Sequence, residues 1–170
     1  TAYKRPDLVD RLATTAKRIG DPSFHVFVVG EFKQGKSSLV NALLNAPVCP
    51  VDDDIATSAP TAVRYGEEAS AAVLLKPPEE DDPSTPGVDE RTEPTREEIP
   101  IEQVAQYVTE AANPANERRV QAVEVSIPRK LLADGLVIVD TPGVGGLGSA
   151  HSAATIGALP MADAVLFVSD

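Results

Sequence analysis

Apolar residues occur in short runs bounded by turn-forming residues, which is the pattern of buried strands in a sheet. The first run, Phe24 to Val29, is β-branched and aromatic and ends at a glycine. Similar runs, which we predict to be strands, occupy residues 71–75, 136–139 and 165–168. Residues 120–127 alternate in part, and we expect them to pair antiparallel with the 136–139 strand.

Helical spacing of apolar residues appears in three places. Leu39, Leu43 and Leu44 share one side of a helix that follows the first strand. Residues 7–19 form an amphipathic helix that Gly20 and Pro22 terminate, and its partner is either a helical bundle or the sheet. A short helix is expected at residues 101–112. The acidic, proline-rich stretch at about 77–100 has no apolar period, so we interpret it as a solvated insertion.

Between the first strand and its helix, residues 30–37 have the form G-x-x-x-x-G-K-S, the phosphate-binding loop. Glycines let the backbone curl so that N–H groups face nucleotide phosphates, the lysine adds positive charge, and the serine hydroxyl binds Mg²⁺. The motif requires a strand before it and a helix after it, and both are predicted. The predicted phosphate-binding residues are Gly30, Lys33, Gln34, Gly35, Lys36, Ser37 and Ser38.

A second motif follows the apolar run at 136–139. Asp140 lies at the carboxyl end of that strand, where α/β sheets bind ligands, and it is predicted to hold Mg²⁺ through water. Thr141, Pro142 and Gly143 complete the D-x-x-G form. Because an ATPase usually has a glutamate next to this aspartate, the motif favours a GTPase, with the Gly143 N–H sensing the γ-phosphate.

GTPases also use a threonine that closes over Mg²⁺ and the γ-phosphate. The stretch at residues 50–64 directly follows the phosphate-loop helix and has no apolar period, so we interpret it as a mobile loop. Thr61 is our choice, as a metal ligand and catalytic residue, because it directly precedes a new apolar strand. Thr57 and Ser58 are the alternatives.

The predicted fold is an α/β P-loop domain with a mainly parallel sheet flanked by helices. It divides into an N-terminal helix at 1–22 and a partial GTPase domain at 23–170. No Asn/Thr-Lys-x-Asp motif, which reads guanine, is present in the sequence. We therefore expect the chain to be an incomplete domain from a longer protein.

Three groups of residues together resemble the GTPase domain of bacterial dynamin-like proteins. They are the phosphate loop with Ser38, Leu39 and Asn41, the stretch Pro60 to Gly66, and the glycine-rich run Asp140 to Gly148. The resemblance implies GTP as substrate, GDP as product and Mg²⁺ as cofactor. It also implies a homodimer formed through the GTPase domain, and membrane remodelling through segments outside this chain.

The sequence departs from related GTPases at two positions. Phe32 and Val144 stand where dynamins and Ras-type proteins respectively place a glutamine that orients water, and neither side chain can do so. Lys33 lies where guanylate-binding proteins carry an arginine finger, so the likeness implies a catalytic cation alongside Lys36. The simpler interpretation of Lys33 is a solvated surface lysine.

The net charge of the chain excludes some classes of binding partner. The formal net charge is −11, which argues against nucleic acid and against direct contact with an anionic membrane. The single cysteine, Cys49, fits a reducing cytoplasm. We therefore expect a cytoplasmic protein, and the resemblance implies that it is held peripherally at the inner face of the plasma membrane. The alternatives are a soluble regulatory GTPase that acts through partner binding, and a nucleotide-gated scaffold with negligible turnover.

Overall fold

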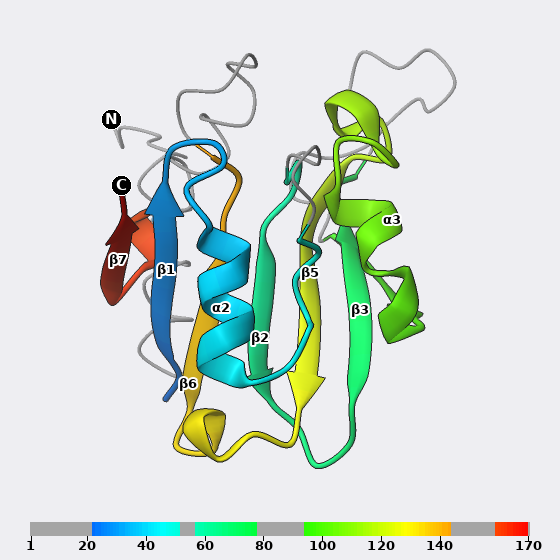
Figure 1. Ribbon diagram of the computed structural model, residues 1–170. Coiled ribbons are helices and arrows are strands. Elements are labelled where there is room, and N and C mark those ends of the chain that lie inside the picture. The colour runs from blue at the N-terminus through cyan, green and yellow to red at the C-terminus, as the bar shows by residue number, and fades with distance from the viewer. Residues whose placement is uncertain (1–21, 52–56, 78–93, 144–158, 170) are drawn as a thin grey trace, which may run out of the picture.

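The computed structural model describes residues 22–51, 57–77, 94–143 and 159–169 (Figure 1). Within these residues seven strands form one sheet, in the order β4-β3-β5-β2-β6-β1-β7. The strands are β1 Phe24–Gly30, β2 Thr61–Tyr65, β3 Ser70–Leu75, β4 Thr95–Ile99, β5 Val120–Ile127, β6 Leu136–Asp140 and β7 Ala164–Val168. The α-helices are α2 Lys36–Leu44 and α3 Ala105–Val108. Short 3₁₀ helices lie at Ile101–Gln103, Pro114–Asn116, Lys130–Leu132 and Leu159–Met161.

The α/β fold predicted from the sequence is confirmed, but its sheet is mixed. β1 runs parallel to β6 and β7, and β2 runs parallel to β5. The β2–β6, β3–β4 and β3–β5 pairs are antiparallel, so the described sheet is not mainly parallel. The expected antiparallel pairing of residues 120–127 with 136–139 is wrong, because β2 lies between β5 and β6. Adjacency in the sequence was a poor guide to adjacency in the sheet.

Both described α-helices cover the same face of the sheet (Figure 1). Beneath them lies the main hydrophobic core, which includes Val28, Val40, Leu44 and Val63. A smaller cluster of four buried residues lies on the opposite face: Phe27, Val29, Val137 and Val139. Successive side chains of β1 therefore point alternately into the two hydrophobic cores. Burial of these β-branched side chains on both faces is why the strands read as continuous apolar runs.

The helix expected at residues 101–112 is shorter in the structure. It consists of a 3₁₀ turn and α3, and the backbone becomes extended at Thr109. The side chain of Asn113 donates to the Tyr107 carbonyl and accepts from the Arg118 backbone N–H. The amide side chain thus takes the place of further helical turns in bonding these backbone carbonyl and N–H groups. The helix predicted at residues 7–19 lies outside the described residues.

Strand β4 lies inside the segment that the sequence suggested was a solvated insertion. Four of its five residues are exposed, and Arg96, Glu97 and Glu98 give it a charged sequence. Its place at the sheet edge explains this, because edge strands commonly carry charge. Glu124 on β5 bonds both Arg64 on β2 and Arg96 on β4. None of the described helices is long and apolar enough to cross a membrane.

Candidate functional site

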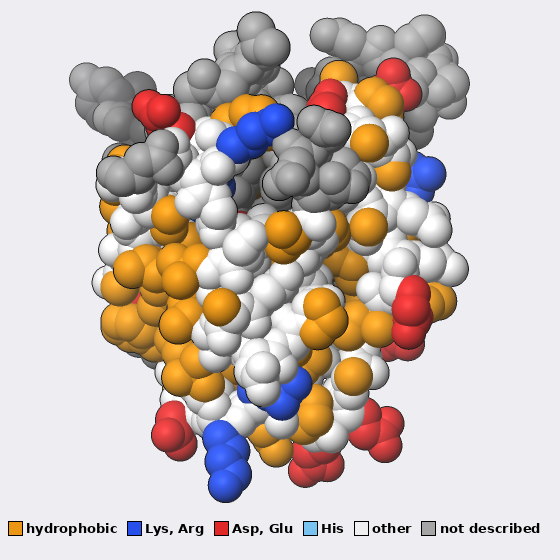
Figure 2. Space-filling model, in the orientation of Figure 1, with side chains coloured by type: hydrophobic (Ala, Val, Ile, Leu, Met, Phe, Trp, Pro, Cys, Tyr) orange, Lys and Arg blue, Asp and Glu red, His pale blue; other side chains and the backbone are white. Residues whose placement is uncertain are grey.

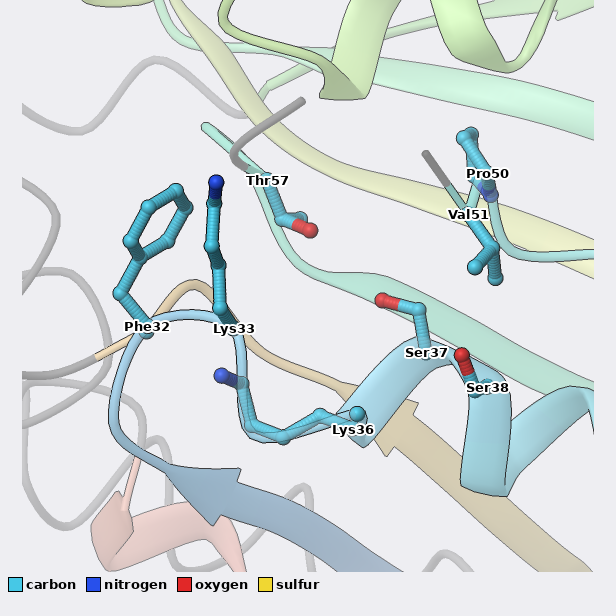
Figure 3. Close-up of a pocket in the computed structure, with 10 residues that line it drawn as sticks. Phe32, Lys33, Lys36, Ser37, Ser38, Pro50, Val51 and Thr57 are labelled. Carbon is cyan, nitrogen blue, oxygen red and sulfur yellow. The ribbon is translucent and has the colours of Figure 1, made fainter. Parts of the chain in front are cut away.

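A pocket of about 400 Å³ opens where β1 leads into α2. In the space-filling view, basic side-chain atoms border this hollow (Figure 2). It is lined on one side by the phosphate loop and on the other by residues that follow α2 (Figure 3). The lining residues are Phe32, Lys33, Gly35, Lys36, Ser37, Ser38, Pro50, Val51, Thr57 and Gly143. The pocket therefore unites both sequence motifs at the carboxyl ends of β1 and β6, where α/β sheets bind ligands.

The backbone of the phosphate loop leaves the start of α2 open. Gly35 is the N-cap, with φ of 78°, a left-handed conformation that favours glycine. No side chain caps the helix and its first turn contains no acidic residue. The first N–H groups of α2 consequently remain available to an anion, and the helix dipole favours one there.

Lys36 begins α2, and only 7% of its surface is exposed. Its ammonium donates to the Glu31 carbonyl oxygen at 2.7 Å, within the same loop. Burial lowers the pKa of Lys36, while the nearby Asp140 carboxylate acts in the opposite direction. The loop therefore holds a partly desolvated cation beside the pocket.

Ser37 and Asp140, which are far apart in the sequence, are in direct contact. The Ser37 hydroxyl donates to Asp140 Oδ2 at 2.6 Å. Asp140 is 1% exposed, and burial raises its pKa to about 6 despite opposing effects of Ser37, Lys36, Cys49 and the Thr141 backbone. Among the described residues its buried Oδ1 accepts no hydrogen bond of good geometry, although the Cys49 thiol and the Thr141 backbone lie close enough to the carboxyl to lower its pKa. A buried carboxylate oxygen without a good hydrogen bond is costly, so this one is poised for a ligand.

The candidate threonines occupy different places. Thr57 lines the pocket, and in Figure 3 its hydroxyl oxygen points toward the Ser37 side chain at the start of α2. Thr61 is fully buried, does not line the pocket, and is paired in register with Asp140. Its Oγ1 and that of Ser58 are buried, with no hydrogen-bond partner in the part of the chain that the structure describes. Thr57 is thus the candidate threonine that lines the pocket, whereas Thr61, our first choice, is buried beside Asp140, which does not line the pocket either.

The other residues predicted to bind nucleotide also fall into two groups, those that line the pocket and those that do not. Lys33, Ser38 and Gly143 line the pocket, whereas Gly30 and Gln34 do not. The Lys33 ammonium lies 5.5 Å from the centroid of the Phe32 ring. Figure 3 shows the two side chains next to each other at the mouth of the pocket. Val144 lies outside the described residues.

Gly143 is positioned by close contact with the phosphate loop. A Cβ at this position would lie 2.8 Å from the Phe32 Cα and 2.9 Å from the Phe32 nitrogen. The two motifs therefore touch backbone to backbone, an approach that only glycine permits. Thr141 strengthens the same junction, because its hydroxyl donates to the Val28 carbonyl oxygen at 2.7 Å.

The oxygen atoms at this site suit Mg²⁺. This ion is commonly bound by one or two carboxylates together with substrate phosphates and water. The buried Asp140 Oδ1 and the adjacent Ser37 hydroxyl provide such oxygens. Ser37, Asp140 and a threonine hydroxyl would hold the ion beside the phosphates.

Sequence reasoning missed the wall of the pocket opposite the phosphate loop. Pro50 and Val51 line it, yet nothing in their sequence pattern suggests a binding role. Cys49 is 3% exposed and interacts with Asp140. The segment carries no chemical signature because its contribution is shape.

A strand, a glycine loop with a buried lysine, and an aspartate from a neighbouring strand define a P-loop nucleotide-binding domain. Comparison with known proteins narrows this class. The model of the dynamin family matches residues 26–170, and the chain belongs to that family of GTPases.

Individual relatives agree. The chain is 46% identical to the isoniazid-induced protein IniA of Mycobacterium tuberculosis over 167 residues, which are 98% of this chain and 24% of that protein. It is 26% identical over 160 residues to the bacterial dynamin-like protein of Nostoc punctiforme, covering 94% of this chain and 22% of that one. The chain thus spans about a quarter of the length of these relatives.

A solved structure shares the fold. It comes from an oligomerised bacterial dynamin pair described as a mechanism for long-range sensing and tethering of membranes. The alignment has a TM-score of 0.60 at 22% identity and covers 95% of this chain and 22% of that one. The bacterial dynamin-like resemblance stated from the motifs is confirmed.

Gly143→Ala is expected to weaken nucleotide binding at least tenfold, because the added methyl group forces the phosphate loop away from β6. Binding of a fluorescent GTP analogue measures this. Gly66→Ala is the matched control, since its Cβ would also clash, at 2.7 Å from the Ser126 Cβ, but away from the pocket. Equal affinity losses in both variants would contradict the proposed contact.

Asp140→Asn is expected to raise the melting temperature of the nucleotide-free protein at pH 7.5. The raised pKa of about 6 means that the buried charge destabilises the fold above pH 6, and that this effect fades as the pH falls through 6. Thermal unfolding from pH 5 to pH 8 should show that the increase in melting temperature of the variant over wild type becomes smaller toward low pH. The variant should also lose the extra stabilisation by Mg²⁺ with nucleotide. A pH-independent loss of stability would contradict this assignment.

Proposed function

We propose that this chain binds GTP with Mg²⁺ and hydrolyses it to GDP and phosphate. The observation that carries the proposal is the contact of Ser37, which lines the pocket, with the buried Asp140, next to Lys36. A hydroxyl, a carboxylate and an ammonium group gathered at the open start of a helix form a set suited to a triphosphate with its metal. Guanine as the base is supported by the D-T-P-G motif and by the family.

Phosphate binding is assigned to the loop. The first N–H groups of α2 and the backbone at Lys33 and Gly35 would cradle the phosphates, while Lys36 would add charge. The Lys36 ammonium now donates to the Glu31 carbonyl, so binding requires it to exchange that partner for a phosphate oxygen. This exchange is favourable because a charged acceptor makes a stronger hydrogen bond than a carbonyl does.

The metal is assigned to Ser37, Asp140 and a threonine. Mg²⁺ would neutralise charge on the phosphates during in-line attack by water. Ser37 would exchange its hydrogen bond to Asp140 for the ion. Thr57 is the better placed of the two threonines, because it lines the pocket while Thr61 is sealed in the sheet.

Activation of water is the weakest part of the site. Phe32 lines the pocket at the position expected to polarise water, and its ring cannot do so. Lys33 is a cation that lines the pocket, beside that ring. We assign it a role in stabilising transition-state charge when a second copy of the domain presses on the loop. A lysine supplies a point charge without the bidentate geometry of arginine.

In the whole protein, this cycle would drive self-assembly at the inner face of the plasma membrane and remodelling of the bilayer. The family, and the sensing and tethering of membranes described for the similar bacterial dynamin pair, support this step. The acidic chain itself is a poor ligand for anionic lipid. Membrane contact would therefore fall to segments outside this chain.

Two lysine variants test the proposal. Lys36→Ala should abolish binding of a fluorescent GTP analogue, because the buried charge beside the phosphates is lost. Lys33→Ala should keep the affinity within about threefold and lower turnover at high protein concentration, since its role is confined to the transition state. Phosphate release is measured against protein concentration, with and without liposomes.

Retained GTP affinity in Lys36→Ala would contradict the site assignment. Turnover that rises with concentration and lipid supports the dynamin-like activity. Turnover that is independent of both would support a soluble regulatory GTPase. Tight binding with near-zero turnover would support a scaffold, which the position of Phe32 favours.

Two threonine variants separate the candidate metal ligands. Thr57→Val should reduce Mg²⁺-dependent GTP affinity about tenfold or more, because a hydroxyl at the pocket is lost. Thr61→Val should leave affinity unchanged and raise thermal stability, because its buried hydroxyl has no hydrogen-bond partner among the residues that the structure describes. Titrations with and without Mg²⁺ and thermal unfolding measure both effects. The reverse pattern would restore Thr61 as the metal ligand.

A further inference from the structure

The side chain of Asn41, in the middle of α2, is bonded to the chain that follows the helix. Its Oδ1 accepts from the Val48 N–H at 3.0 Å and from the Cys49 N–H at 2.8 Å. Its Nδ2 donates to the Cys49 carbonyl oxygen at 2.7 Å. One amide thus replaces the water that two backbone donors and an acceptor would otherwise bind. The segment is fixed to the helix at three points.

This bonding is not required to end the helix. The N–H groups of Asn45 and Ala46 already bond the carbonyls of Ala42 and Asn41. Asn45 adopts the left-handed conformation common at helix C-termini. The backbone alone therefore completes the C-terminus of α2. The Asn41 side chain acts on what comes after it.

The segment that Asn41 holds is the wall of the pocket. Pro50 and Val51 directly follow Cys49 and line the cavity opposite the phosphate loop (Figure 3). Cys49 itself is 3% exposed and lies beside the Asp140 carboxylate, which adds to burial in raising the pKa of the thiol. The same helix carries Lys36 and Ser37 in its first turn. The backbone of Asn41 therefore belongs to the helix that carries the phosphate-binding residues, and its side chain bonds the wall that faces them.

We propose that Asn41 is a positioning residue that fixes the Cys49–Val51 wall to the phosphate-binding helix. Phosphate-binding groups and wall then form one rigid body, with the width of the pocket set by the three hydrogen bonds of one side chain. This inference rests on the proposed nucleotide function, and it deepens that function by naming what shapes the pocket.

The residues that directly precede β2, at the other end of the connection from α2, are bonded to a different helix. The Ser58 N–H donates to the Val108 carbonyl oxygen at 2.7 Å, and Thr57 bridges to Thr109. These contacts belong to the end of α3, not to α2. The pocket therefore has two wall sections with separate supports. Removal of the Asn41 side chain should therefore loosen Pro50 and Val51. The contact of Thr57 with Thr109, at the end of α3, should remain.

Asn41→Ala tests the proposal, with Asn116→Ala as the matched control. Asn116 is another amide that closes a turn, through bonds with the Val120 N–H and carbonyl, and it does not line the pocket. Both variants should lower the melting temperature. Only Asn41→Ala should weaken binding of the GTP analogue, by about tenfold, because only its hydrogen bonds shape the pocket.

Cys49 offers a second measurement that does not depend on nucleotide. It is the single cysteine of the chain, so its reaction rate with an aromatic disulfide reagent reports on the wall alone. In the nucleotide-free protein the rate should rise about tenfold or more in Asn41→Ala and stay unchanged in Asn116→Ala, since local opening controls access to a buried thiol. Asn41→Asp, which retains the two acceptor bonds, should lie between wild type and Asn41→Ala. It replaces Asn41→Ala if that variant does not fold.

The outcomes are separable. An unchanged thiol rate and unchanged affinity in folded Asn41 variants would overturn the positioning role. Equal effects in the Asn116 variant would reduce Asn41 to a general stabilising residue and also overturn it. If wild type fails to bind GTP, the proposed function falls, while the thiol rates still decide whether Asn41 holds the wall.

Discussion

The buried carboxylate of Asp140 is the constraint on which the site depends. Removing a charged group from water is costly, and the pKa of about 6 reflects that cost. Ser37 and Lys36 offset part of it through a hydrogen bond and an opposite charge, but within the described chain Oδ1 accepts no hydrogen bond of good geometry. A fold that keeps such a group at the end of a core strand maintains an incomplete polar cluster. A divalent cation with a phosphate chain would complete it, which ties the stability of this region to ligand binding.

The order of strands explains how the pocket acquires its second side. β6 lies between β1, which is parallel to it, and β2, which is antiparallel. Since β2 runs the opposite way, it starts at the edge where β6 ends, and Thr61 pairs with Asp140. The chain leaving α2 must therefore return to that edge before β2 begins. This topology places the Cys49–Val51 wall and Thr57 across the pocket from the phosphate loop.

The sequence predicted features that depend on local spacing, because glycine positions and apolar runs determine local backbone conformation. The phosphate loop, the D-x-x-G turn and the strands at residues 24–30 and 136–140 are of this kind. Strand order could not be read in the same way, since β2 is inserted between β5 and β6 by contacts distant in the sequence. β4 was missed because an edge strand with charged side chains resembles a solvated loop. The choice between Thr57 and Thr61 depended on burial, which neighbouring residues alone do not reveal.

Close packing shapes this site as much as charge does. Gly143 touches the backbone at Phe32, Thr141 bonds to Val28, and Asn41 holds Cys49, so each part of the pocket is attached to a different strand or helix. A change in one contact shifts a backbone segment as a unit, because the interior is packed too densely to deform gradually. A nucleotide that displaces Gly143 or the Cys49–Val51 wall by a fraction of an ångström would therefore move a whole segment.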